Sequence, residues 1–413
     1  MTEVFLLLIV LIIQTFFGFL IFEFKSFRFD LLKSPLYLIV AIPVVSLIYF
    51  FLTILHIPFQ MISLLIMLSC VFGFTKTSFE HFTFKLSHVA FIIFVIMSML
   101  PLAGSSFFEG ITKTGDISII STKDHDALWH IGLTESIENS IPPVNPVFAF
   151  EKLKNYHYLT DAFMAFLSQI TKIPVANIYL KWFPFILSFL LIYSTHNLFY
   201  LLAKRKIIAY LASLLVFFSS SLSYLVPLFF KDAFVSQSNF WLDQPTRYLV
   251  NLQLSLSLIV TNAILFLILN STKKYLLIIT ILLSSLVGIK IYGFIILLLS
   301  FYLIGFFNGI KNKDWDFLKI AILASAVGFL ILAGTGVNSG FPFIFKPGWF
   351  IESMYQSLDR LNYSEWEIHR QLFLQTSNYP RLIFHWFLGI IVFFTGNFGL
   401  KIIGLFFANI YLI

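Results

Sequence analysis

The sequence has little charge and a single cysteine. Of its 413 residues, 11% are charged and 59% are hydrophobic, whereas soluble domains are about 25% charged and about 45–50% apolar. So few charged side chains cannot cover a water-facing surface, which excludes an ordinary soluble protein and predicts lipid as the surrounding solvent. The lone cysteine, Cys70, excludes a disulfide scaffold and a cysteine-based metal site.

Several recognisable motifs are also missing. The chain has no His-Glu-x-x-His motif, no Gly-rich nucleotide loop and no Walker motif, which argues against a zinc protease and a nucleotide-sugar donor. The N-terminus lacks a basic region before its first apolar run and a cleavage site after Phe22, so we expect a retained span rather than a signal peptide. The last residue, Ile413, lies inside an apolar run, which leaves open that the chain is a fragment of a longer protein.

Long apolar runs are what the sequence does contain. A spanning helix needs about 20 mainly apolar residues, so the runs predict an all-α, polytopic membrane protein of 11 to 12 spans. We interpret the run from Tyr275 to Phe307 as a hairpin that bends at Gly288 and Lys290. The predicted spans are Val4–Phe22, Pro35–Leu55, Ile57–Thr75, Val89–Gly104, Val175–Ala203, Ile207–Phe230, Tyr248–Asn270, Tyr275–Ile289, Ile291–Phe307, Phe317–Ala333, Leu382–Thr395 and Ile402–Ile413.

These spans divide the chain into five parts. We expect N-terminal transmembrane helices over 1–104, an outer loop over 105–174, a transmembrane core over 175–333, a second outer loop over 334–381 and C-terminal transmembrane helices over 382–413.

The formal net charge of +7 is informative only once it is divided across the membrane. With the N-terminus outside, the predicted inner side carries 14 basic and 5 acidic residues, and the outer side carries 13 basic and 15 acidic residues. Because basic residues concentrate in short cytoplasmic loops of membrane proteins, we predict a multi-pass cell-membrane protein whose long acidic loops are extracytoplasmic. The division also removes the reason to expect a nucleic-acid partner.

The first outer loop carries the strongest pattern. Two short amphipathic helices are predicted, over Ala127–Glu138 and Thr160–Ile170, both lying at the membrane surface. An i,i+4 spacing places Asp126 and His130 on one helical face, and His157 and Asp161 repeat that spacing in reverse order. We therefore expect two carboxylate–imidazole pairs on one outer face.

This cluster suits two kinds of chemistry. A carboxylate can act as general base toward an acceptor hydroxyl while a histidine orients it. Alternatively, Asp124, Asp126 and His157 could ligate a divalent cation, Mg²⁺ or Mn²⁺, that neutralises a phosphate leaving group. The structural alternative is a helix N-cap with a solvated face, as for the similar Asp314–Trp315–Asp316 in a predicted inner loop.

The loop resembles the first large outer loop of polytopic glycosyltransferases with the GT-C fold, which use polyprenyl-phosphate sugars. The residues that carry the resemblance are Asp124–His125–Asp126, Trp129–His130, Pro142–Pro143 and Tyr156–His157–Tyr158. It implies a GT-C-like fold in which Asp124 or Asp126 is the catalytic base or lies beside a metal. In that class the acidic motif normally follows the first span, whereas four predicted spans precede it here; this implies an N-terminal addition or a different family with a similar loop.

Two basic residues farther along the chain complete the predicted site. Lys290 interrupts an apolar run, where a charge is a functional candidate by default, although it could also snorkel to the interface. Arg247 opens a span on the outer side, where it could contact phosphate or serve as an anchor. Tyr156 is either a substrate contact or an interfacial residue. The candidates for substrate binding are His130, Tyr156, His157, Asp161, Arg247 and Lys290.

The charges of the second outer loop receive a different interpretation. Arg360 and Arg370 could contact phosphate, but solvated loop charge is the preferred interpretation.

The leading hypothesis is a glycosyltransferase that moves a sugar from a polyprenyl-phosphate donor to a glycan, lipid or protein acceptor, with inversion by an aspartate base. One alternative is a transporter or flippase for a lipid-linked glycan, although acidic residues are absent from the span interiors. The other is an O-antigen-type polymerase or ligase, which would share the polytopic build.

Overall fold

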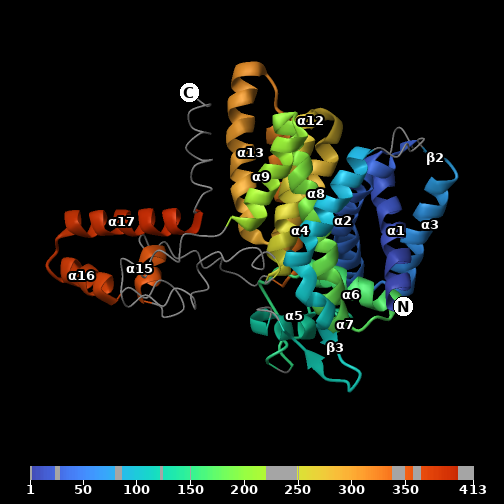
Figure 1. Ribbon diagram of the computed structural model, residues 1–413, viewed down its shortest axis with the longest axis horizontal. Coiled ribbons are helices and arrows are strands. Elements are labelled where there is room, and N and C mark those ends of the chain that lie inside the picture. Colours follow the sequence, from blue (N-terminus) through green and yellow to red (C-terminus); the bar gives the residue numbers. More distant parts are fainter. Residues whose placement is uncertain are drawn as a thin grey trace. The chain divides into compact units, whose positions relative to one another are not determined.

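The computed structural model describes residues 2–23, 28–79, 86–120, 124–148, 150–219, 249, 251–336, 349–356 and 364–398. The chain forms two compact units, of which unit 1 comprises residues 1–210 and 248–338 and unit 2 comprises residues 211–247 and 339–413. Figure 1 shows their helices, which make up most of the described chain.

Unit 1 contains most of the helices. They are α1 (Thr2–Phe22), α2 (Ser34–Ile54), α3 (Phe59–Phe74), α4 (Leu86–Ala103), α5 (Asp124–Ile137), α6 (Leu159–Thr171), α7 (Val175–Asn177), α8 (Phe183–Ala203), α12 (Leu252–Ile289), α13 (Ile291–Asn312) and α14 (Asp316–Gly334). A π-helical segment, Ile178–Trp182, joins α7 to α8. Short 3₁₀ helices cover Leu31–Lys33 and Gly104–Phe108, and α9 (Lys206–Phe218) crosses the unit boundary.

Strands are few and short. β1 (Arg28–Phe29) pairs in parallel with β2 (Ser78–Phe79), and β3 (Gly110–Ile111) pairs antiparallel with β4 (Ile117–Ser118). Unit 2 contains α15 (Trp349–Gln356), α16 (Ser364–Gln375) and α17 (Tyr379–Phe398). The all-α class predicted from the sequence is confirmed.

Seven helical segments among the described residues are long and apolar enough to cross a membrane. They lie at 2–22, 31–54, 86–108, 175–203, 252–289, 291–312 and 316–334, and shorter apolar helices lie at 59–74, 206–218 and 379–392. The protein is therefore polytopic, and each segment falls on an apolar run identified in the sequence. The count of 11 to 12 spans stays a prediction, because Ile402–Ile413 lies outside the described residues.

The segment from Leu252 to Ile289 is a helical hairpin. A straight helix of 38 residues would be about 57 Å long, nearly twice the thickness of the hydrocarbon core, about 30 Å. Its backbone leaves the helical region at Ser271 (φ −177°, ψ 105°) and again at Tyr275 (φ −109°, ψ 15°). Asn251, just before its start, lies 3.4 Å from the Nζ of Lys290, just after its end. The two halves must therefore run antiparallel, as the predicted spans Tyr248–Asn270 and Tyr275–Ile289 require.

A second break in the helical path lies at Lys290. Its backbone is extended (φ −160°, ψ 102°) between the end of α12 and the start of α13. The bend predicted at Gly288 and Lys290 is therefore at Lys290 alone, since Gly288 is inside α12. A Cβ at Gly288 would lie 2.4 Å from the Cγ of Leu159, so glycine is required for α6 to pack closely against α12.

The core of unit 1 is formed by α2, α6, α8 and α12. Tyr37 and Phe50 of α2 and Phe163 of α6 are all 0% exposed. The outer helices leave large apolar side chains uncovered, for example Phe5 at 66% and Phe329 at 70% exposure. A protein in water would avoid such a surface, whereas lipid solvates it.

The helix α6 differs from the prediction. A surface-lying amphipathic helix was expected over Thr160–Ile170, but α6 is buried on nearly every side. The cause is its central run from Ala162 to Leu167, which is apolar around the whole helix and packs against α2, α5 and α12.

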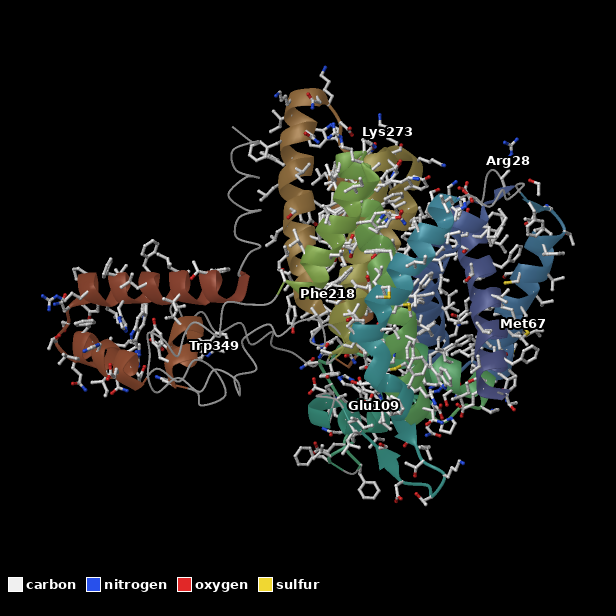
Figure 2. The ribbon with its side chains drawn as sticks, viewed as in Figure 1. Arg28, Met67, Glu109, Phe218, Lys273 and Trp349 are labelled. Carbon is white, nitrogen blue, oxygen red and sulfur yellow. The ribbon has the colours of Figure 1, made fainter. Side chains whose placement is uncertain are left out.

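The two ends of unit 1 differ in composition. Arg28 and Lys273 lie at one end, and Glu109 lies at the other, together with α5 and β3 (Figures 1 and 2). The lysines and arginines assigned to the predicted inner side thus include two that share one end of the helical bundle.

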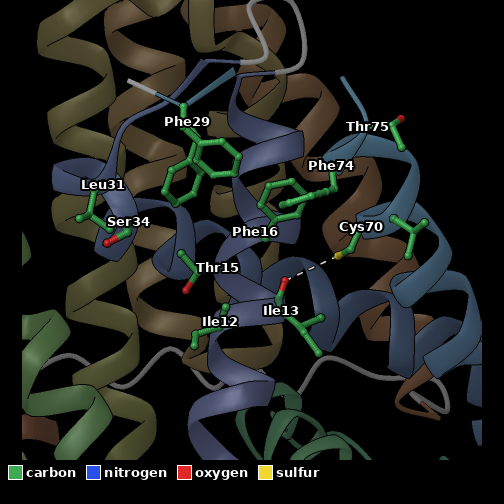
Figure 3. A pocket seen from close by; sticks show the side chains of 12 residues that line it. Ile12, Ile13, Thr15, Phe16, Phe29, Leu31, Ser34, Cys70, Phe74 and Thr75 are labelled. Carbon is green, nitrogen blue, oxygen red and sulfur yellow. Dashed lines mark hydrogen bonds between the residues drawn. The ribbon is translucent and has the colours of Figure 1, made fainter. Parts of the chain in front are cut away.

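An apolar cavity of about 720 Å³ lies between α1, α3 and the β1 strand. Phe16, Phe29 and Phe74 form much of its wall, and the Sγ of Cys70 lies 3.6 Å from the carbonyl oxygen of Ile13 (Figure 3). None of the predicted site residues lines it.

Candidate functional site

The candidate site is organised by α5, which begins at Asp124. Asp126, His130 and Thr134 follow one another at i,i+4 spacing and therefore share one face. The shared face of Asp126 and His130 is as predicted. The side chain of Asp124 lies outside the described part of the chain, but the first turn of a helix favours negative charge because of the helix dipole.

Asp161 of α6 pairs with His130 of α5. The Nδ1 of His130 lies 2.9 Å from the Oδ1 of Asp161, and the two residues are 2% and 0% exposed. Thr134 donates to the same carboxylate oxygen at 3.5 Å. A buried carboxylate is stable only when it is paired and hydrogen-bonded, and this contact therefore joins the two short helices of the outer loop.

The pairing predicted from spacing is wrong in one respect. His157 was expected to pair with Asp161 within one helix, but α6 begins at Leu159, so His157 precedes it and does not share its face. Asp161 instead contacts a histidine 31 residues earlier in the chain. The predicted pair of His157 and Asp161 is thus replaced by a pair between two helices.

Two side chains that the sequence did not single out complete the surroundings of His130. The amide Nε2 of Gln253 in α12 lies 2.8 Å from its Nδ1 and 3.2 Å from its Nε2. The ring of Tyr179 stacks on the imidazole at 5.9 Å with an interplanar angle of 11°. Gln253 and Tyr179 are both fully buried, and neither stands in a pattern that points to a site.

The charge of His130 follows from this environment. Burial disfavours the imidazolium, but the nearby carboxylates of Asp161 and Asp126 outweigh burial and the opposing Lys290, and they raise the pKa of His130 above its ordinary 6.5. The pair with Asp161 therefore favours the protonated form of the imidazole.

Asn251 links an acidic side chain to a basic one. Its Nδ2 donates to the Oδ2 of Asp126 at 3.4 Å, and its Oδ1 accepts from the Nζ of Lys290 at 3.4 Å. The same Oδ1 caps α12 by accepting from the N–H of Leu254 at 2.9 Å. Asn251 is thereby held in place, and it fixes Asp126 and Lys290 at the same end of the bundle.

Lys290 is a largely buried cation, with 8% of its surface exposed. Its Nζ lies 5.4 Å from the centre of the Tyr292 ring, a cation–π distance. Among the described residues, no carboxylate lies within ion-pair distance of Lys290. No carboxylate of the described residues therefore competes with an anionic ligand for this cation.

Tyr156 and His157 form an aromatic group beside this cation. Their rings stack at 4.6 Å with an interplanar angle of 17°, and Trp129 meets Tyr156 edge-on at 5.9 Å. Burial, together with Lys290 and His130 and against Asp161, lowers the pKa of His157 to about 4. Burial, reinforced by Asp161, raises the pKa of Tyr156 to about 12. Both side chains are therefore neutral at physiological pH.

The predicted metal set is only partly covered. Among the described residues, no group of three or more His, Cys, Asp and Glu side chains is placed to hold a metal ion. The side chain of Asp124 is not among them, so the set of Asp124, Asp126 and His157 stays a prediction. Arg247 also lies outside the described residues.

Unit 2 holds a separate ion-pair cluster. Arg370 is 5% exposed and donates to Glu367 through Nε at 2.7 Å and to Glu352 through Nη1 at 3.2 Å. The interpretation of Arg370 as solvated loop charge is therefore wrong, because α16 carries Arg370 and Glu367 at i,i+3 spacing and α15 adds Glu352. Its guanidinium is already neutralised. Arg360 lies outside the described residues.

No protein family matches the sequence, and no curated protein and no solved structure shows significant similarity to it.

Proposed function

We propose that this protein is a glycosyltransferase of the cell membrane that transfers a sugar from a polyprenyl-phosphate donor to an extracytoplasmic glycan, lipid or protein acceptor. The observation that carries the proposal is the arrangement of Asp126, Asn251 and Lys290. One amide holds a carboxylate and a largely buried ammonium close together, at the ends of long apolar helices.

The arrangement suits a donor whose lipid part lies in the bilayer. Lys290 sits where α12 ends and α13 begins, and a polyprenyl phosphate presents its charge at the membrane surface. The largely buried surroundings of Lys290 strengthen the attraction between ammonium and phosphate, because the local dielectric constant is lower than that of water. His157 is neutral beside Lys290 and can exchange hydrogen bonds with the bound sugar phosphate.

Asp126 is the base in this proposal, with Asp124 as the alternative. The acceptor hydroxyl loses its proton to the carboxylate as its oxygen forms a bond with the anomeric carbon. The bond from that carbon to the phosphate oxygen breaks, and the electron pair leaves with the polyprenyl phosphate. A single displacement of this kind inverts the anomeric centre. The pair of His130 and Asp161 positions α5, and therefore Asp126.

The experiment supplies purified protein with a panel of radiolabelled polyprenyl-phosphate sugars and an extract of cell-envelope lipid, glycan and protein as acceptors. Transfer is measured with added Mg²⁺ or Mn²⁺ and with a chelator, which tests the proposed cation. We expect transfer from at least one donor, and a loss of about 10²-fold or more in Asp126→Asn or in Asp124→Asn, the usual contribution of a general base.

The matched control is Asp314→Asn, which alters the same Asp-x-Asp pattern in the loop between α13 and α14 and is expected to keep full activity. Full activity in both Asp124→Asn and Asp126→Asn would overturn the assignment of the base. Movement of a lipid-linked sugar across proteoliposomes without any covalent transfer would overturn the proposed reaction in favour of transport.

A further inference from the structure

A second cavity lies at the other end of α5 from Asp126. Its volume is about 340 Å³, and it is enclosed by the turn between α2 and α3, the residues just after α5, and α6. Ligand sites in proteins typically measure about 300–1,000 Å³. The cavity is therefore large enough for a small organic ligand.

The floor of the cavity is polar and fixed by hydrogen bonds. Tyr49 of α2 donates to the Oε1 of Gln169 at 3.2 Å, and the Nε2 of Gln169 donates to the backbone oxygen of Glu138 at 2.9 Å. Phe59 of α3 meets the Tyr49 ring edge-on at 6.3 Å and adds an apolar wall. Because three elements are tied together, the cavity has a defined shape rather than one set by loop movement.

Glu138 lines this cavity, and one of its carboxyl oxygens has no partner in the described part of the chain. Its Oε1 is shielded from solvent and has no hydrogen-bond partner among the described residues. Burial, with Glu135 and against Ser168 and Lys172, raises the pKa of Glu138. A buried acceptor oxygen without a partner is unfavourable, and a ligand hydroxyl would supply the missing donor.

The mixture of polar and apolar side chains in the cavity lining favours one class of ligand. The lining includes the polar His56 and Asn139, the charged Lys152 and Glu138, and the apolar Phe59. An acyl chain would leave the polar groups without partners, and an inorganic anion would pair with Lys152 but meet the carboxylate of Glu138 and leave the apolar wall uncovered. A sugar ring has hydroxyls on its edge and C–H groups on its face, so it matches both kinds of lining.

We propose that this cavity binds a sugar unit of the acceptor, with Glu138 accepting a hydrogen bond from a sugar hydroxyl. Glu138 follows Asp126 by 12 residues, or about 18 Å along a helix, so the bound unit lies several sugar residues away from the reacting hydroxyl. The role of the cavity as an acceptor subsite rests on the proposed function, whereas the binding of a sugar in the cavity does not.

The test measures binding of free sugars to the full chain in lipid nanodiscs by saturation-transfer difference NMR. The probes are glucose, galactose, mannose, N-acetylglucosamine and disaccharides of these, with no lipid-linked donor present. We expect at least one probe to receive saturation from the wild-type protein. Glu138→Gln and Asn139→Trp should each weaken that probe's affinity by about tenfold or more, the first by changing the acceptor and the second by blocking the mouth from an exposed position.

Glu151→Gln is the matched control, because Glu151 is exposed in the loop between α5 and α6 and does not line the cavity; it should bind like the wild type. Asp126→Asn should also bind normally, which separates a failure of this site from a failure of the proposed reaction. Absence of any signal from the wild-type protein would overturn the proposal, as would equal binding by Glu138→Gln, Asn139→Trp and Glu151→Gln.

Discussion

At the scale of single residues, the contact between His130 and Asp161 is the most consequential. Both side chains are almost completely buried, and the pair lies between α5 and α6. Removal of one partner leaves the other as an unpaired polar or charged group in a low-dielectric environment. Such changes typically destabilise a protein by about 3–5 kcal/mol.

We predict that Asp161→Asn lowers the unfolding temperature in a pH-dependent way. The pKa of His130 in the folded protein is raised above 6.5. The ion pair therefore contributes its full stability below the ordinary pKa and loses it as pH rises through the folded pKa. The difference in unfolding temperature between wild type and Asp161→Asn should shrink as the pH rises above 6.5, as measured by thermal unfolding in detergent.

The control for this prediction is Asp116→Asn, since Asp116 is exposed in the turn between β3 and β4. It should unfold with the wild type at every pH. A difference for Asp161→Asn that does not change with pH would contradict the contribution of the His130 charge to this contact.

The site residues were only partly predictable, because their contact partners lie far away in the sequence. Asp126 and His130 share a helical face, which local spacing indicates. The partner of His130 is 31 residues away, and that of Asp126, Asn251, is 125 residues away. Asn251 and Gln253 carry no charge and match no motif, so nothing in their local sequence distinguishes them from ordinary polar residues near the start of a helix.

At the scale of secondary-structure elements, close packing of α6 against α12 positions the site. Gly288 lies one residue before the end of α12 and faces Leu159, the first residue of α6. Even a methyl group at Gly288 would overlap Leu159, whose Cγ would be 2.4 Å from the new Cβ. The carboxylate of Asp161 is two residues farther along α6, so a shift of this helix moves it relative to His130.

We predict that Gly288→Ala destabilises the protein by about 1–3 kcal/mol, the usual effect of overpacking. Gly293→Ala is the matched control, because a Cβ at Gly293 meets nothing within 4 Å and alanine favours a helix by about 1 kcal/mol over glycine. The measurement is the thermal unfolding temperature of both variants, which should be lower for Gly288→Ala than for Gly293→Ala. Equal unfolding temperatures for the two would contradict the packing account, and Leu159→Ala in the Gly288→Ala background should restore part of the loss.

The helices themselves were largely predictable, because each apolar run carries its own information about length and boundaries. The ends of α1, α2 and α14 fall within a few residues of the predicted spans. The burial of α6 was not predictable from its polar flanks. A helix of 13 residues is too short to be identified as a span, and its surroundings are supplied by distant parts of the chain.

At the scale of the whole molecule, sidedness decides whether the site can use an extracytoplasmic acceptor. Arg28 and Lys273 lie at the end of unit 1 opposite to Glu109 (Figure 2). Positively charged residues near the ends of spans are retained in the cytoplasm, so the end that carries α5 should face outward. The common end of Arg28 and Lys273 agrees with the predicted inner side to which the sequence assigned both residues.

We predict that this orientation is visible by cysteine labelling. Cys70 is the only cysteine in the chain, so Cys70→Ser provides a background without thiols. In that background, Asp116→Cys should react with a membrane-impermeant maleimide on intact cells, because the β3–β4 turn is exposed at the α5 end. Lys273→Cys, at the turn of the α12 hairpin, should react only after permeabilisation. The reverse pattern would place Asp126 and Lys290 on the cytoplasmic side, where a sugar acceptor outside the cell cannot reach them, and would therefore contradict the proposed reaction whatever the activity of the purified protein.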